Sequence, residues 1–127
     1  MDKFLKEYEG YKFEDWGAYC SDDFKSFTRK FKGFLKRNLP SDLELIGFKP
    51  NHYDFSGFVK HGGEYIYVSY SWDRLHPLSI NRDDPLGGVL VRFAKNEKDY
   101  RGETNQFTCF KNLPDFLVEM FVKRGRA

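Results

Sequence analysis

The segment "HYDFSGFVKHGGEYIYVSYSW", residues 52–72, decides the fold because it has the pattern of a single β-hairpin. Gly62 and Gly63 separate two runs of aromatic and β-branched residues, and a glycine pair supplies the positive φ angles of a tight turn. Because side chains alternate along a strand, Ile66, Val68 and Tyr70 share one face of the second run. The opposite face carries Tyr65, Tyr67, Ser69 and Ser71.

An amphipathic helix is predicted before the hairpin, in "SDDFKSFTRKFKGFLKRNLP", residues 21–40. Ser21 is a favourable N-cap, the two aspartates after it suit the positive end of the helix dipole, and Pro40 ends the helix. One apolar stripe repeats at helical spacing and predicts the buried face. The stripe consists of Phe24, Phe27, Phe31, Phe34 and Leu35.

Further strands and a second helix surround these elements. The segments "LELIGF" (43–48) and "VLVRFA" (89–94) alternate like strands, and "QFTCF" (106–110) is another candidate. A short C-terminal helix is predicted in "LPDFLVEMFVKR" (113–124), with its apolar side at Phe116, Leu117, Met120 and Phe121.

Strands grouped between helices predict one α+β domain over residues 1–127. Its antiparallel sheet has about four strands and packs against the long helix and the short C-terminal helix. We expect residues 1–20 to form a peripheral N-terminal segment.

Composition points to a folded domain with an uneven charge distribution. Aromatic residues make up 19% of the chain, and rings supply much burial per residue, which argues against disorder. Residues 1–23 hold 3 basic and 7 acidic groups, whereas the remaining residues hold 18 basic and 12 acidic groups. A basic body with an acidic N-terminal segment suits a polyanion or an acidic protein surface as partner, and a solvated, salt-bridged surface is the alternative.

No signal peptide and no membrane-spanning run is evident, so we expect a cytoplasmic protein with no membrane partner. Cys20 and Cys109 are then expected to be reduced and structural. The histidines do not fall at known metal-ligand spacings from these cysteines, and the sequence predicts no metal or cofactor. It does not predict the oligomeric state.

The first candidate site is "VLVRFAKNEKDYRGETN", residues 89–105. We expect Val89 to Ala94 to be an inner strand that projects Arg92 from the sheet, where a carboxylate or an anionic ligand would satisfy its charge. Cations around an exposed aromatic residue suit a stacked base or an interface hot spot, and a solvated loop is the alternative. The candidate binding residues are Arg92, Lys95, Lys98, Asp99, Tyr100 and Arg101.

The polar face of the long helix is a secondary candidate. Its basic stripe has no glutamate and consists of Lys25, Arg29, Lys32 and Lys36, flanked by Lys30 and Arg37. Such a stripe suits phosphate groups, and the simpler interpretation is the solvated face of an amphipathic helix.

An acid–base set is the third candidate. Histidine and aspartate exchange protons near neutral pH, and an arginine holds a phosphate, as a small nuclease would require. The residues are His52, Asp73, Arg74 and His76. Their spacing matches no nucleophile motif, so we expect a protein without catalytic activity.

Three blocks of the chain, within residues 24–121, resemble a motif of small accessory proteins on mobile elements of Firmicutes, such as conjugative transposons. That motif is close to "GHYxxSGF…SxSDxR…ILxRTAKxxKDYTGGxN". The matching segments are "NHYDFSGF" at 51–58, "SYSWDR" at 69–74 and "VLVRFAKNEKDYRGETN" at 89–105. The chain departs from the motif at Trp72, which replaces its aspartate, and at Glu103, which replaces its second glycine.

The resemblance implies accessory work for a mobile element, including countering host defence. In general style the chain is also similar to anti-CRISPR proteins. Together, these resemblances imply a non-enzymatic inhibitor that binds a host defence protein or ribonucleoprotein complex, with the acidic N-terminal segment as a nucleic-acid mimic. A nucleic-acid-binding accessory protein is the alternative, and a small nuclease is the second alternative.

Overall fold

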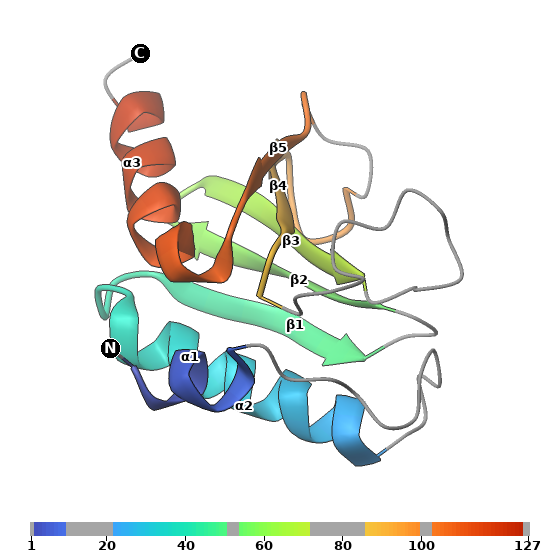
Figure 1. Cartoon of the computed structure of the whole chain (residues 1–127). Helices are drawn as coiled ribbons and strands as arrows, with labels where there is room; N and C mark the ends of the chain where they lie inside the picture. Colours follow the sequence, from blue (N-terminus) through green and yellow to red (C-terminus); the bar gives the residue numbers. More distant parts are fainter. Residues whose placement is uncertain (1, 10–21, 51–53, 72–85, 100–102, 126–127) are drawn as a thin grey trace.

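The protein is an α+β domain in a computed structural model that describes residues 2–9, 22–50, 54–71, 86–99 and 103–125 (Figure 1). The described helices are α1 (Lys3–Tyr8), α2 (Asp22–Asn38), α3 (Leu113–Gly125) and the 3-10 turn η1 (Phe110–Asn112). The described strands are β1 (Glu44–Pro50), β2 (Asp54–His61), β3 (Glu64–Ser71), β4 (Val89–Ala94) and β5 (Gln106–Thr108). The predicted fold class and both predicted helices are confirmed.

The strands form one antiparallel sheet in the order β1-β2-β3-β4-β5, so each strand pairs with its neighbours in sequence. The sheet has 5 strands where the sequence predicted about four, because the short β5 pairs with β4 through Leu90 and Phe107. Strand β4 lies between β3 and β5, and its prediction as an inner strand is confirmed.

The turn between β2 and β3 differs from the prediction at one glycine. Gly62 has a φ of 59°, whereas Gly63 does not have a positive φ. A positive φ at only the first central residue is the pattern of a type II′ turn, which suits the twist of a two-residue hairpin. The flanking residues His61 and Glu64 pair directly across the strands.

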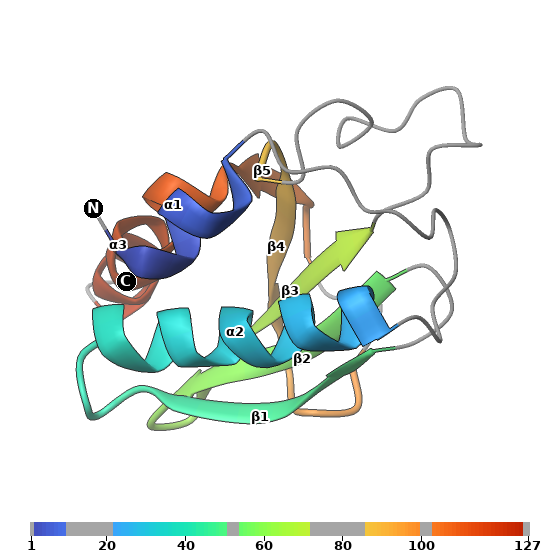
Figure 2. The same cartoon turned by 60° about the horizontal axis from the view of Figure 1, so that its bottom comes forward.

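Helix α2 lies along one face of the sheet and buries the predicted apolar stripe against it (Figure 2). Phe27, Phe31 and Leu35 are fully buried, and Phe34 is 1% exposed. The sheet contributes Phe55, Val59, Ile66, Val68, Tyr70, Val89 and Val91 to the same cluster. The predicted alternation of β3 is therefore confirmed, while Ser21 and the side chain of Phe24 lie outside what the structure describes.

Glycine is required at Gly57 because the ring of Phe48 covers that point of β2. A Cβ atom at this position would lie 2.5 Å from Phe48 Cγ. Phe48 is 3% exposed and its ring lies 5.7 Å from the ring of Phe31, so β1, β2 and α2 meet at this contact.

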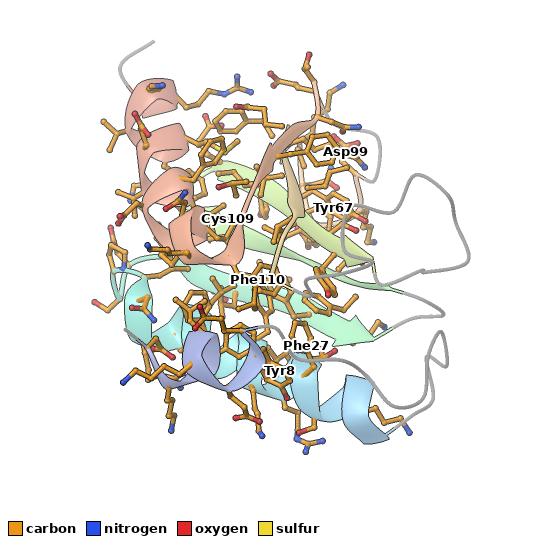
Figure 3. All side chains as sticks on the ribbon, in the orientation of Figure 1. Tyr8, Phe27, Tyr67, Asp99, Cys109 and Phe110 are labelled. Carbon is orange, nitrogen blue, oxygen red and sulfur yellow. The ribbon has the colours of Figure 1, made fainter. Side chains whose placement is uncertain are left out.

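Helix α1 belongs to the core, although the sequence suggested a peripheral segment for residues 1–20. Phe4 is 1% exposed, and its ring centroid lies 5.1 Å from that of Phe34 and 5.8 Å from that of Phe110. Tyr8 packs edge-on against Phe27 at 4.7 Å. Figure 3 shows Tyr8, Phe27 and Phe110 in the layer between the helices and the sheet.

Helix α3 covers another part of the same face of the sheet. Its residues Leu113 and Leu117 are fully buried, and Met120 and Phe121 are nearly so, which confirms most of the predicted apolar side. Cys109 is a free, half-buried thiol just before η1. Cys20 lies outside the described residues.

Candidate binding surface

The face of the sheet opposite the core is the main candidate site, and we call it the open face. The helices in the described part of the chain pack on the other face, together with Ile66, Val68 and Val91. Strand pairing places one row of side chains across the open face, since Ile46 faces Phe58, Phe58 faces Tyr67, and Tyr67 faces Arg92. The row joins four strands, so it is held by backbone pairing rather than by a loop.

Arg92 is held over an aromatic ring within this row. Its guanidinium carbon lies 4.5 Å from the centroid of the Tyr67 ring, and its Nη1 donates a hydrogen bond to Asn105 Oδ1 at 3.0 Å. The Tyr67 ring is in turn 5.3 Å from the ring of Phe58, which is 3% exposed. A cation over a ring keeps its charge but loses part of its conformational freedom, so the Arg92 side chain is held in a defined orientation.

Phe107 adds an exposed ring at the edge of the open face. It pairs with Leu90 across the strands. Leu90 and Arg92 are two residues apart on β4, so both side chains lie on the same face of the sheet. The Phe107 side chain is 60% exposed, and it is one of two large apolar residues with such exposure in the described part of the chain. An exposed ring beside a fixed arginine is a composition typical of interface hot spots.

The loop after β4 is folded around Asp99. The Asp99 side chain accepts a hydrogen bond from the Lys95 backbone N–H at 2.9 Å, and Asn96 Oδ1 accepts one from the Lys98 backbone N–H at 2.8 Å. Asp99 therefore shapes the turn, whereas Lys95 and Lys98 are exposed. The other predicted members of this site, Tyr100 and Arg101, lie outside the described residues.

Arg124 fastens the end of this loop to α3, and no pattern in the sequence indicated this role. Its guanidinium lies 4.1 Å from the centroid of the Phe93 ring and forms ion pairs with Glu103 and Glu64. Hydrogen bonding from Arg124 lowers the pKa of the Glu103 carboxyl. Glu103 stands where the resembled motif has a glycine, so this departure supplies one partner of the ion pair.

The loop and Arg92 thus have different surroundings. Lys95 borders a depression with Glu64, Glu103 and Arg124 at one end of the sheet. Arg92 contacts Tyr67 and Asn105 on the open face. The described residues of the predicted cluster are therefore divided between the strand and the loop. The row of Phe58, Tyr67 and Arg92 could be recognised only from the strand register.

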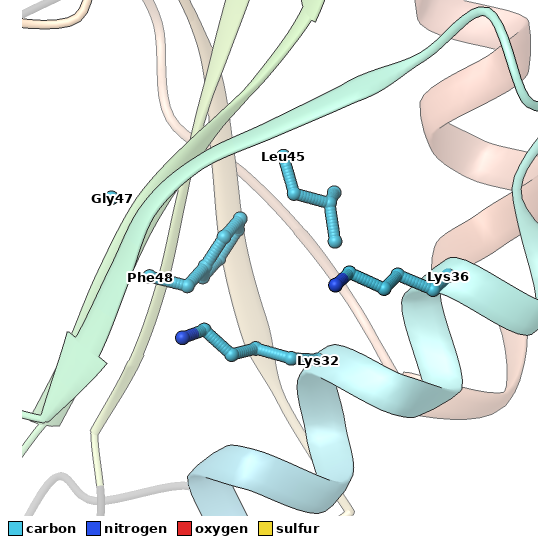
Figure 4. A pocket seen from close by; sticks show the side chains of 5 residues that line it. All are labelled: Lys32, Lys36, Leu45, Gly47 and Phe48. Carbon is cyan, nitrogen blue, oxygen red and sulfur yellow. The ribbon is translucent and has the colours of Figure 1, made fainter.

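The basic helix divides into paired and unpaired cations. Lys30 pairs with Glu7 at 2.5 Å and Arg37 pairs with Asp2 at 2.7 Å, so α1 and its N-cap residue neutralise the two flanking cations. Among the stripe residues, Lys25, Arg29 and Lys36 are exposed and Lys32 is half-buried. Lys32 and Lys36 line a groove with β1 (Figure 4).

The acid–base candidates His52, Asp73, Arg74 and His76 all lie outside the described residues. Within the described ranges, no group of three or more His, Cys, Asp or Glu side chains is placed to hold a metal ion. Nor does any helix described in this chain combine the length and apolar character of a membrane span. His61 Nε2 lies 3.1 Å from Asp42 Oδ2, at the turn end of the hairpin.

Comparison with known protein families, curated proteins and solved structures finds no match to this chain. The roles of the open face and of the groove lined by Lys32 and Lys36 are therefore inferred from the side chains that form them.

Proposed function

We propose that this protein is a non-enzymatic inhibitor that binds a host nucleic-acid-directed defence complex in the cytoplasm. The observation that carries the proposal is the arrangement of Arg92 over Tyr67, with Phe107 at the edge of the same face. Arginine and aromatic side chains dominate binding energy at protein interfaces when they stand on a rigid scaffold.

The nature of the partner rests on the resemblance to accessory proteins of mobile elements. Complexes that act on nucleic acid carry positively charged channels as well as protein surfaces. An inhibitor of such a complex needs a rigid surface and no catalytic group. The open face offers a surface of this kind, because backbone pairing across four strands fixes its side chains.

The first test measures whether the protein inhibits DNA cleavage by purified RNA-guided nuclease complexes. The second measures its binding to the same complexes after they are immobilised and treated with nuclease. We expect Arg92→Ala and Tyr67→Ala to weaken binding about thirtyfold, since hot-spot truncations cost about 2 kcal/mol. Most of the change should appear in the dissociation rate. Lys123→Ala is the control, because Lys123 is exposed and lies on α3.

Two results would count against this function. Binding of Arg92→Ala and Tyr67→Ala like wild type would exclude the open face as the contact surface. Absence of inhibition by a folded wild-type protein, over a panel of such complexes, would exclude this class of partner.

Nucleic-acid binding is the second candidate, because a guanidinium over a ring also provides a surface on which bases stack. Exposed Lys95 and Lys98 would then contact phosphates. Fluorescence anisotropy with labelled single-stranded DNA and RNA separates the two. Nucleic-acid binding predicts a steep fall in affinity with added salt, whereas protein binding persists after nuclease treatment.

A further inference from the structure

A groove between α2 and the edge strand β1 carries two cations and an apolar floor (Figure 4). Lys32 and Lys36 come from α2, and Leu45 and Phe48 come from β1. Strand β1 is at the edge of the sheet, and the opposite edge is β5, where Phe107 lies. The groove is therefore a separate site from the open face.

Lys32 and Lys36 differ from Lys30 and Arg37 in having no acidic partner among the described residues, and they differ from Lys25 and Arg29 in lining the groove. Lys30 is paired with Glu7 of α1, and Arg37 is paired with Asp2, the N-cap residue of α1. Across the described residues, neither Lys32 nor Lys36 forms an ion pair. Figure 4 shows both side chains extending from α2 toward β1, so both ammonium groups lie at the groove.

The spacing of the lysines suits an extended acidic chain. Residues four apart on a helix have Cβ atoms about 5–6 Å apart. Alternate residues of an extended chain lie about 6.6 Å apart on one side. Carboxylates at alternate positions can therefore meet both ammonium groups, while the stems of the same side chains contact the half-buried Leu45.

A second copy of this chain is a poorer occupant. The pairing of β1 with β2 shifts between Ile46 and Lys49, where Gly47 has a φ of 69°. Such a bulge bends the edge and opposes continuous pairing between two copies of the same strand. A short segment from another protein is not restricted in this way.

We propose that the groove between α2 and β1 binds an extended acidic segment of a partner protein, with carboxylates at alternate positions on Lys32 and Lys36. The same cations attract the phosphates of a nucleic acid, but the apolar floor and the strand-like spacing favour a peptide. Binding should weaken with salt, because Lys36 is exposed.

The experiment uses the full chain and three fluorescein-labelled probes. The first is a peptide with glutamates at alternate positions between valines, and the second has the same composition with its glutamates adjacent. The third is an eight-nucleotide single-stranded DNA. We expect the first peptide to bind at least fivefold more tightly than the second, and more tightly than the oligonucleotide.

The variant pair is Lys32→Glu/Lys36→Glu and its control Lys25→Glu/Arg29→Glu, which changes net charge equally on the same helix. Lys25 and Arg29 are exposed and do not line the groove. We expect the groove variant to lose at least tenfold in affinity and the control less than threefold, as long-range attraction alone is weak. If the groove variant does not fold, two further measurements test the same site. Lys32→Gln/Lys36→Gln removes both charges without reversing them, and the amide chemical shifts of Leu45 and Gly47 in the wild type report peptide binding at the groove.

Equal losses in the groove variant and the control would overturn the proposal, because attraction to the whole basic surface would then account for binding. Tighter binding of the oligonucleotide would assign the groove to nucleic acid instead. Equal affinity for the two peptides would overturn the extended arrangement.

Discussion

The two faces of the sheet use aromatic residues in different ways. On the helix-covered face, the rings of Phe27, Phe31, Phe55 and Phe110 are all fully buried in one hydrophobic cluster. On the open face, the guanidinium of Arg92 lies over the ring of Tyr67, and Tyr67 is half-buried. The comparison indicates that the first face supplies most of the buried core, whereas the second face is the surface on which the proposed function depends.

The strongest test of this division is Phe31→Ala. The Phe31 ring lies 4.7 Å from that of Phe55 and 5.2 Å from that of Phe110, and the side chain is fully buried. We expect the free energy of unfolding to fall by about 3–5 kcal/mol, the usual cost of removing a large core side chain. Urea denaturation measures the change, and Tyr67→Ala should cost clearly less. A loss below about 1 kcal/mol for Phe31→Ala would contradict the assignment of the core face.

A second test probes how tightly the covered face is packed. In Gly57→Ala, the new methyl group meets the Phe48 ring at 2.5 Å unless the ring moves. We expect a loss of about 1–3 kcal/mol, as for other overpacked cores. Adding Phe48→Ala provides space, so Gly57→Ala should cost little in the Phe48→Ala background. Additive costs in the double variant would show that the effect arises elsewhere than at this contact.

The covered face could be predicted from the sequence because its signals are local. The spacing of Phe27, Phe31 and Phe34 identifies a helix face, and Gly62 identifies the hairpin turn. Helix α1 was not predicted as core because Phe4 and Tyr8 make too short a pattern. Their burial depends on α2 and η1, which are far away in sequence.

The open face was harder to predict because its members come from different strands. Arg92 was expected to project from the sheet toward a carboxylate or an anionic ligand. Its guanidinium lies over the Tyr67 ring and bonds to Asn105, and both contacts depend on the strand register. Arg124 was missed because a cation near a helix C-terminus is common, and only the fold brings Glu103 and Glu64 beside it.

A smaller effect is expected at Asp2, which fastens the outer layer of the covered face. Its carboxylate caps α1 through the Phe4 N–H at 2.9 Å and binds Arg37 and Asn38 of α2. We expect Asp2→Ala to cost about 1–2 kcal/mol at pH 7 and Asp2→Asn less, because asparagine still caps the helix.

The ion pair also makes this contribution depend on pH. Hydrogen bonding from Arg37 holds the pKa of the Asp2 carboxyl well below its usual range. The unfolded-state pKa is about 3.9, so the stabilisation is complete above about pH 5 and is lost as pH falls through the lower folded-state pKa. Urea denaturation at pH 7 and pH 3 should show a smaller stability difference for Asp2→Asn than for wild type. Equal differences would mean that Asp2 and Arg37 do not pair in solution.

The smallest effect on stability is expected at Phe107, where the comparison between the faces is sharpest. The residue is as large as Phe31, but its side chain is 60% exposed, so Phe107→Ser removes little buried area. We expect the free energy of unfolding to change by less than about 0.5 kcal/mol, as for most surface positions. A loss above about 1.5 kcal/mol would mean that Phe107 is covered in solution. If a second copy of the chain covered it, the melting temperature would rise with protein concentration, and a concentration series on wild type and Phe107→Ser would reveal this. A concentration-independent melting temperature, with stability close to that of wild type, would leave Phe107 available to a partner on the open face.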